Sequence, residues 1–169
     1  IVTGVGGTGV ITIGQIMAMA AHLQGKSCSV LDMTGLAQKG GAVMSHVRLA
    51  DKAEDIQSTR VGTGMADLVI GCDLIVTAGK DAVSRMGEGR TQGAINASSS
   101  PTATFIKNPN WQFPAGSAEA EIRKACGNDR VDMVDATTIA TALMGDSIAA
   151  NMFMLGYSWQ KGWVPLSEA

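Results

Sequence analysis

The sequence has little charge, little histidine and few cysteines. Charged residues make up 17% of its 169 residues, the net charge is -2, and no run of basic residues occurs. This balance argues against nucleic acid or an anionic membrane as the main partner. The sequence also contains no signal peptide and no apolar run long enough to span a bilayer. A chain of this length suffices for one domain with a core of its own, and we treat residues 1–169 as such.

The three cysteines, Cys28, Cys72 and Cys126, are far apart and form no C-x-x-C pattern. We therefore expect no iron–sulfur or zinc site built from this chain alone. An odd number of cysteines in apolar settings indicates reduced thiols and a cytoplasmic location. The chain begins inside an apolar strand without an initiator methionine, so we expect it to be part of a longer, multidomain polypeptide.

The low charge content has two interpretations. It favours a domain whose surface is partly covered by something else, and the ten methionines point weakly the same way because methionine fills adaptable interfaces. The alternative is an α/β domain rich in small residues, since 21 glycines dilute the charge.

The rest of the chain is organised around the glycine stretch at residues 4–9. Gly4, Gly6 and Gly9 match G-x-G-x-x-G, and Gly7 and Thr8 complete the loop. An apolar strand precedes it and an apolar helical pattern follows from Val10. A strand, a glycine loop and a helix in this order present backbone N–H groups to an anion.

Asp32 follows the last glycine by roughly 20 residues, where a second strand should end, as a dinucleotide-binding fingerprint requires. The alternative interpretation is a tight strand-to-helix turn in a Rossmann-like domain that binds no nucleotide.

A second glycine-rich loop spans residues 34–41 and is expected at the same carboxyl edge of the sheet. Ligands of open α/β sheets bind at that edge. Lys39, Gly40 and Gly41 would present an ammonium group and amide N–H groups to a phosphate or carboxylate. The alternative is a flexible exposed loop with an ordinary surface lysine.

Residues 42–50 alternate as a strand with mixed faces that carries His46 and Arg48. His46 is isolated from any nucleophile pattern, so we interpret it as structural. No Ser–His–Asp order, no paired carboxylates and no metal motif stands out, so we assign no catalytic residue and no metal ligand.

The hydrophobic periodicity predicts the other elements. Asp73 is expected to cap one helix and Ser117 another. The segment 98–114 is expected to cross the sheet and hold by its aromatic side chains. The predicted strands are 28–33, 66–71, 92–97 and 131–135, and the predicted helices are 10–24, 74–86, 118–126, 137–143 and 147–160.

Several stretches together resemble the gamma domain of 2-oxoacid:ferredoxin oxidoreductases, and within that family the large fused bacterial indolepyruvate enzymes. The resemblance covers essentially the whole chain. The stretches that carry it are GVGGTGV at 4–10, GLAQKGGAV at 35–43, SHVR at 45–48, ADLV at 66–69, DSIA at 146–149, GYSWQKG at 156–162 and VPLS at 164–167.

The resemblance implies an α/β, Rossmann-like three-layer domain with a mainly parallel sheet. It implies that the complete enzyme oxidatively decarboxylates an aryl 2-oxoacid such as indolepyruvate. Thiamine diphosphate and iron–sulfur clusters would reside in other domains, ferredoxin would accept the electrons and coenzyme A the acyl group. The gamma domain would help build the assembly and the coenzyme A side of the site, with no activity of its own. The glycine loop, Lys39, Gly40, Gly41 and Arg48 are then the candidate ligand contacts.

Two alternatives stay open at this point. One is a free-standing oxidoreductase that binds NAD or FAD through the glycine stretch and Asp32. The other is an assembly module whose glycine loop packs against a neighbouring subunit and binds no ligand.

Overall fold

Six strands form one mixed sheet in the order β2-β3-β1-β4-β5-β6. The computed structural model describes residues 1–35, 41–98 and 115–168. The strands are β1 (Val2–Val5), β2 (Ser27–Thr34), β3 (Ala42–Ala50), β4 (Leu68–Gly71), β5 (Gln92–Asn96) and β6 (Val131–Val134).

Strand β3 is the one antiparallel member of this sheet. β1, β4, β5 and β6 run parallel, while β3 is antiparallel both to β1 and to the edge strand β2. β2 therefore points the same way as β1, with β3 inserted between them. The expected mainly parallel sheet is confirmed. A dinucleotide-binding fingerprint requires the first two strands to be direct neighbours, but here β3 lies between them.

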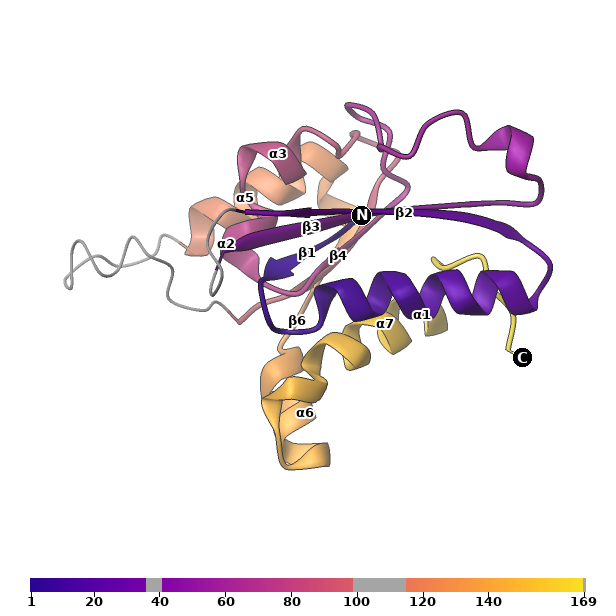
Figure 1. Ribbon diagram of the computed structural model, residues 1–169. Coiled ribbons are helices and arrows are strands. Elements are labelled where there is room, and N and C mark those ends of the chain that lie inside the picture. Colours follow the sequence, from indigo (N-terminus) through magenta and orange to yellow (C-terminus); the bar gives the residue numbers. More distant parts are fainter. Residues whose placement is uncertain (36–40, 99–114, 169) are drawn as a thin grey trace.

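Helices cover both faces of the sheet and complete the three layers (Figure 1). None of the helices in the described residues is long and apolar enough to cross a membrane. One face carries α1 (Val10–Leu23), α6 (Ala136–Met144), the 3-10 turn η3 (Ser147–Ala149) and α7 (Ala150–Gln160). The other carries α2 (Leu74–Thr77), α3 (Lys80–Val83) and α5 (Ala115–Cys126); the short 3-10 turns η1 (Ala53–Asp55) and η2 (Asn128–Arg130) lie in connections.

Each face of the sheet has its own apolar core. Ile13, Met17 and Met154 are buried on the α1/α7 face, where the 3.6-residue period of α1 turns one stripe toward the sheet. Ile95 and Ile122 lie in the core beneath α5 on the other face. Apolar burial thus holds both helical layers on the sheet. The ends of the strands lie outside these cores, where their residues can line a binding site.

Two helix predictions need correction. The helix predicted at 74–86 is two short helices, because Gly79 adopts an extended conformation between α2 and α3. Asp73 caps α2 as expected, its Oδ1 accepting from Val76 N–H at 3.0 Å.

α5 begins at Ala115, so Ser117 lies inside this helix rather than at its N-cap, where it was predicted. The predicted crossing segment 98–114 falls outside the described residues from Ser99 onward.

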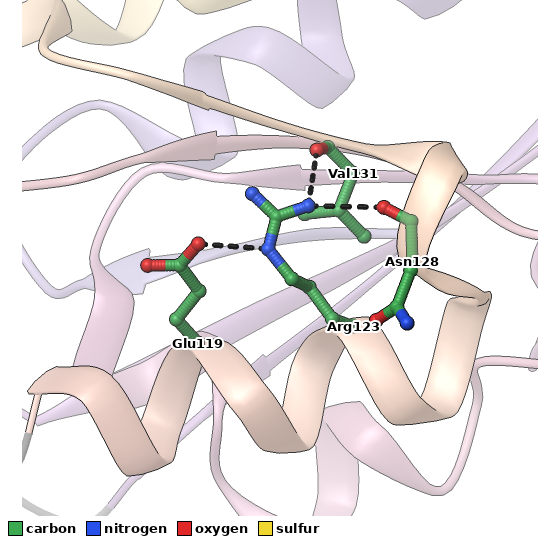
Figure 2. Close-up of polar contacts among 4 residues, drawn as sticks. All are labelled: Glu119, Arg123, Asn128 and Val131. Carbon is green, nitrogen blue, oxygen red and sulfur yellow. Dashed lines mark hydrogen bonds and ion pairs between the residues drawn. The ribbon is translucent and has the colours of Figure 1, made fainter.

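Arg123 joins α5 to the start of β6 (Figure 2). Its Nε donates to Glu119 Oε1 at 2.7 Å, one helical turn away. Its Nη1 donates to the backbone oxygens of Asn128 and Val131, each at 3.0 Å. The guanidinium therefore satisfies two carbonyl groups at the turn that leads from helix to strand.

Replacing Arg123 by methionine is expected to lower the free energy of unfolding by about 2 kcal/mol, since hydrogen bonds from a charged donor are lost and two carbonyls lose a partner. Lys124→Met, at the next and exposed position, is the matched control and should change stability by less than about 0.5 kcal/mol. Urea denaturation of both variants measures the difference. Equal midpoints would show that Arg123 does not hold this turn.

Candidate functional site

The glycine loop joins β1 to α1 at the carboxyl edge of the sheet. Gly7 and Gly9 have φ values of 89° and 93°, in the left-handed region where a side chain is strained. Gly9 is the N-cap residue of α1. The two glycines let the chain reverse within four residues and enter the helix directly above the strand end.

The N-terminus of α1 has no cap from a side chain and no acidic residue in its first turn. The N–H of Ile13 donates to Gly9 O at 3.3 Å, so the helical hydrogen bonds begin there. The earlier N–H groups of the first turn have no acceptor within the helix. Together with the helix dipole, these groups favour an anion at the glycine loop.

The second glycine loop meets the first at the same edge. Gly6 N–H donates to Gly41 O at 2.8 Å, and Gly35 N–H donates to Ala42 O at 3.1 Å. A Cβ on Gly6 would lie 3.4 Å from Gly41 O, so the two backbones are in close contact. The structure therefore brings Gly41 to the glycine loop as expected. Lys39 and Gly40 lie outside the described residues.

A cleft of about 270 Å³ opens beside the glycine loop. The ends of β1, β4 and β5 form its floor, and the start of α6 and the η3 turn form its far wall. Thr8 and Gly7 contribute the near wall. Its other polar lining residues are Asp73, Asn96, Ser98, Thr137, Asp146, Ser147 and Asn151.

Two buried asparagines fix this edge. Asn151, on α7, donates from Nδ2 to Thr8 O at 2.6 Å and to Thr8 Oγ1 at 3.2 Å. Asn96, at the end of β5, donates to Cys72 O at 3.2 Å and Thr137 Oγ1 at 3.0 Å. Asn151 thus holds the glycine loop against α7, and Asn96 ties β4 and β5 to α6.

The sequence prediction missed both asparagines. Asn151 lies in α7, whose other residues are mostly apolar, and a buried amide needs hydrogen-bond partners. An asparagine within an apolar helical pattern was therefore the sequence signal that could have identified Asn151.

The carboxylates of the cleft act as caps. Asp146 Oδ1 accepts from Ile148 N–H at 2.9 Å, in the same way that Asp73 caps α2. No lysine or arginine lines the cleft within the described part of the chain. Positive potential at the cleft comes from the N-terminus of α1 behind the glycine loop, and a cationic contact to a ligand would come from residues outside the described ranges or from another chain.

The thiol in the cleft is not a nucleophile. Burial, and then the charge of Asp73, raises the pKa of Cys72 to about 12. The thiol is therefore protonated at neutral pH and unreactive. Among residues 1–35, 41–98 and 115–168 no three His, Cys, Asp or Glu side chains gather into a possible metal site.

Asp32 does not complete a dinucleotide site. β3 separates β2 from β1, which puts Asp32 about 10 Å to the side of β1. The register pairs Asp32 with Ser45 and Ser45 with Val2, so Asp32 is level with the start of β1 rather than with its end. Its Oδ1 accepts from Ser45 Oγ at 2.5 Å. The position of Asp32 therefore does not support the alternative in which the glycine stretch and Asp32 bind NAD or FAD together.

Arg48 is not brought to the glycine loop either. β3 runs antiparallel to β1, so Ala42 lies beside Val5 and Arg48 lies six residues further, about 20 Å away. Arg48 instead lines a separate cavity of about 660 Å³ at the opposite edge of the sheet, with Arg60 and Arg90. A ligand contact by Arg48 would therefore belong to a different site.

The surroundings of His46 agree with the structural role that the sequence indicates for it. It is fully buried on β3, and its Nδ1 accepts from Val61 N–H at 3.1 Å. Its Nε2 has no hydrogen-bond partner. Burial, and then the positive charges of the chain N-terminus, Arg85 and Arg60, lowers the pKa of His46 to about 4.

Acid should destabilise the fold through His46. Between pH about 6.5 and about 4 the unfolded chain binds the proton and the folded chain does not, so the free energy of unfolding falls as pH falls through this window. His46→Asn keeps an acceptor for the Val61 N–H and should reduce the pH dependence of the free energy of unfolding in this window. Exposed His22→Asn is the control and should leave it unchanged. Urea denaturation across this pH range measures the free energy of unfolding. If it depended on pH equally in wild type and His46→Asn, the assignment to His46 would be refuted.

The fold and the glycine-loop cleft define a class: an α/β domain with a mixed sheet, helices on both faces and a cleft beside a glycine loop at the carboxyl edge of the sheet. All of the chain, residues 1–169, matches the family model for pyruvate ferredoxin/flavodoxin oxidoreductase. The chain belongs to this family, and it is a component of a 2-oxoacid:ferredoxin oxidoreductase.

Two relatives and two solved structures define the similarity further. The indolepyruvate oxidoreductase subunit IorB of Methanothermobacter thermautotrophicus is 26% identical over 155 residues, 92% of this chain and 74% of the relative. IorB of Archaeoglobus fulgidus is 37% identical over 70 residues, 41% of this chain and 33% of the relative.

Among solved structures, the pyruvate oxidoreductase subunit PORC of Thermotoga maritima matches with a TM-score of 0.64 and 23% identity, over 97% of this chain and 76% of that one. The gamma subunit of a keto/oxoacid ferredoxin oxidoreductase from Geobacter sulfurreducens matches with a TM-score of 0.60 and 21% identity, over 96% and 76%. At these identities the two structures support the fold, which is the one expected.

Proposed function

We propose that this chain is the gamma component of an enzyme that oxidatively decarboxylates an aryl 2-oxoacid, with indolepyruvate as the first candidate. Family membership and the names of the IorB relatives support this assignment. In the proposed reaction the 2-oxoacid loses CO₂, ferredoxin takes the electrons and coenzyme A takes the acyl group. Thiamine diphosphate and the iron–sulfur clusters are assigned to other domains or subunits, which are the direct partners of this chain.

The observation that carries the ligand assignment is the glycine loop in front of the uncapped N-terminus of α1, because Gly7 and Thr8 of this loop line the cleft. Coenzyme A carries phosphates, and the glycine loop offers them N–H donors and the positive end of a helix. The fit is for one phosphate group at the loop, because the carboxylates of Asp73 and Asp146 disfavour further negative charge inside the cleft. The proposed contacts are Gly4, Gly6, Gly7, Thr8, Gly9, Gly40 and Gly41 by backbone or close approach, and Lys39 by charge.

The role of this chain is then to bind and orient coenzyme A. Its thiol accepts the acyl group, and a fixed position for its phosphates fixes the reach of that thiol. Nothing in this role needs a catalytic side chain from this component.

Replacing Lys39 by alanine in the complete enzyme tests the charged contact. The KM for coenzyme A is expected to rise about fivefold and to lose part of its dependence on salt, because a charge-assisted phosphate contact is removed. Lys80→Ala, at an exposed position of α3 on the other face, is the matched control. Steady-state kinetics with coenzyme A varied measures both. An unchanged coenzyme A requirement in Lys39→Ala would remove Lys39 from the site.

A further inference from the structure

The helical layer made of α1, α6, η3 and α7 carries no Asp, Glu, Lys or Arg within its helices. The opposite layer is charged in the ordinary way: α3 carries Lys80 and Asp81, and α5 carries four charged residues. The shortage of charged side chains in this sequence is therefore greatest on one face of the domain. We call this face the uncharged layer.

The uncharged layer also exposes large apolar side chains. Of the seven that are exposed in the described part of the chain, only Met65 lies elsewhere. The other six are Ile16, Met19 and Leu23 on α1, and Leu143, Met144 and Ile148 on α6 and η3.

On α1 these side chains form a second stripe. Ile13 and Met17 face the sheet, whereas Ile16, Met19 and Leu23 recur at spacings of three and four residues on the side turned away from it. This spacing is that of a helix that packs against another helix. The hydrophobic core of α1 is thus complete without the second stripe, which has no partner within the described chain.

The apolar patch at α6 and η3 is continuous with the cleft. Ile148 is exposed and also lines the cleft, beside Asp146 and Ser147. Within the described residues the cleft has no cationic side chain. A protein seated on the patch would contact Ile148 and so lie beside the η3 wall of the cleft.

We propose that the uncharged layer is the surface on which another component of the same oxidoreductase docks, and that this component borders the glycine-loop cleft at Ile148. This inference rests on the proposed function, in which the chain works inside a larger enzyme. The docking surface of that component is apolar and uncharged at its centre, since any charge there would be desolvated without a counter-charge. At its rim, basic side chains face Asp135 and Asp146, which flank α6.

Other occupants fit less well. An anionic membrane is disfavoured because helices that lie on such membranes carry Lys and Arg beside their apolar stripe, and α1 has none. A second copy of this chain would match the absence of charge but would bring no cation to the cleft from an equally uncharged layer. The component that carries the reaction chemistry is therefore the better occupant.

Methionine oxidation in the complete enzyme tests the proposal with an internal control. Met19 and Met144 lie on the uncharged layer and are 59% and 71% exposed, while Met65, off the layer, is 52% exposed. Oxidation follows access of the oxidant, so Met19 and Met144 are expected to oxidise about tenfold more slowly than Met65 in the assembled enzyme. Dilute peroxide and peptide mass spectrometry give the three rates. Rates at Met19 and Met144 equal to or above that of Met65 would overturn the proposal.

Photo-methionine incorporated into the complete enzyme identifies the occupant. Cross-links from Met19 and Met144 to another subunit or domain are expected. Cross-links to a second copy of this chain would overturn the assignment of the partner. Because neither readout uses coenzyme A, failure of the docking proposal is separable from failure of the coenzyme A assignment.

Discussion

Replacing Gly4 by alanine is expected to lower the free energy of unfolding by about 3 kcal/mol, because the added Cβ has no space. It would lie 2.7 Å from Val10 Cγ2 and 3.0 Å from Cys72 Cβ, and both side chains are buried. Gly4 has no positive φ, so its importance is close packing of β1 against α1 and the end of β4. This is a different role from that of Gly7 and Gly9, which the same motif contains.

Gly156→Ala is the matched control for Gly4→Ala. Gly156 is exposed inside α7, with no atom within 4 Å of an added Cβ. There the same substitution should raise the free energy of unfolding by up to about 1 kcal/mol, since alanine is the better helix former. Urea denaturation of the two variants should give shifts of opposite sign. A Gly4→Ala variant as stable as wild type would mean that β1 and α1 are not packed as described.

Replacing Asn151 by alanine is expected to raise the KM for coenzyme A by about tenfold or more in the complete enzyme. Asn151 is a positioning residue: it holds the carbonyl and hydroxyl groups of Thr8, and through them the N–H groups of the glycine loop. If the loop shifts by about 1 Å, its N–H groups no longer point at the phosphate. The kcat at saturating coenzyme A should change much less, since no group that touches the reacting atoms is removed.

Gln160→Ala, at the exposed end of the same helix, is the control and should leave both constants unchanged. Asn151→Asp separates position from donor chemistry, because a carboxylate keeps the shape and cannot donate to Thr8 O. Steady-state kinetics with coenzyme A varied measures all three variants. If Asn151→Ala lowered kcat alone, with the KM unchanged, the loop would not be the coenzyme A contact.

The local elements were predictable from the sequence because they depend on local patterns. The alternation at 42–50 and the helical period after Gly9 both correspond to observed elements. The break at Gly79 was not predicted, because an apolar helical pattern continues across it. Glycine there is compatible with either outcome, and packing of Thr77 against Thr3, at 2.8 Å between their hydroxyl oxygens, accompanies the shorter helix.

The site was predictable where it depends on chain order and not where it depends on strand order. The glycine loop and Gly41 lie together because both flank strand ends at the same edge. Asp32 and Arg48 were misplaced because the sequence does not say that β3 enters between β1 and β2 in the antiparallel direction. That choice is made by tertiary packing, and one inserted strand moves each residue of β2 away from β1.

The most direct test of the ligand assignment is calorimetric titration of the complete enzyme with coenzyme A and, separately, with NADH, for wild type and Gly7→Val. Gly7 has a positive φ and open space around it, so valine strains the loop without crowding the core. Coenzyme A is predicted to bind wild type with an affinity that weakens as salt rises, to bind Gly7→Val about tenfold more weakly, and NADH to give no heat. Binding of NADH, or equal affinity of wild type and Gly7→Val for coenzyme A, would contradict a coenzyme A site at the glycine loop.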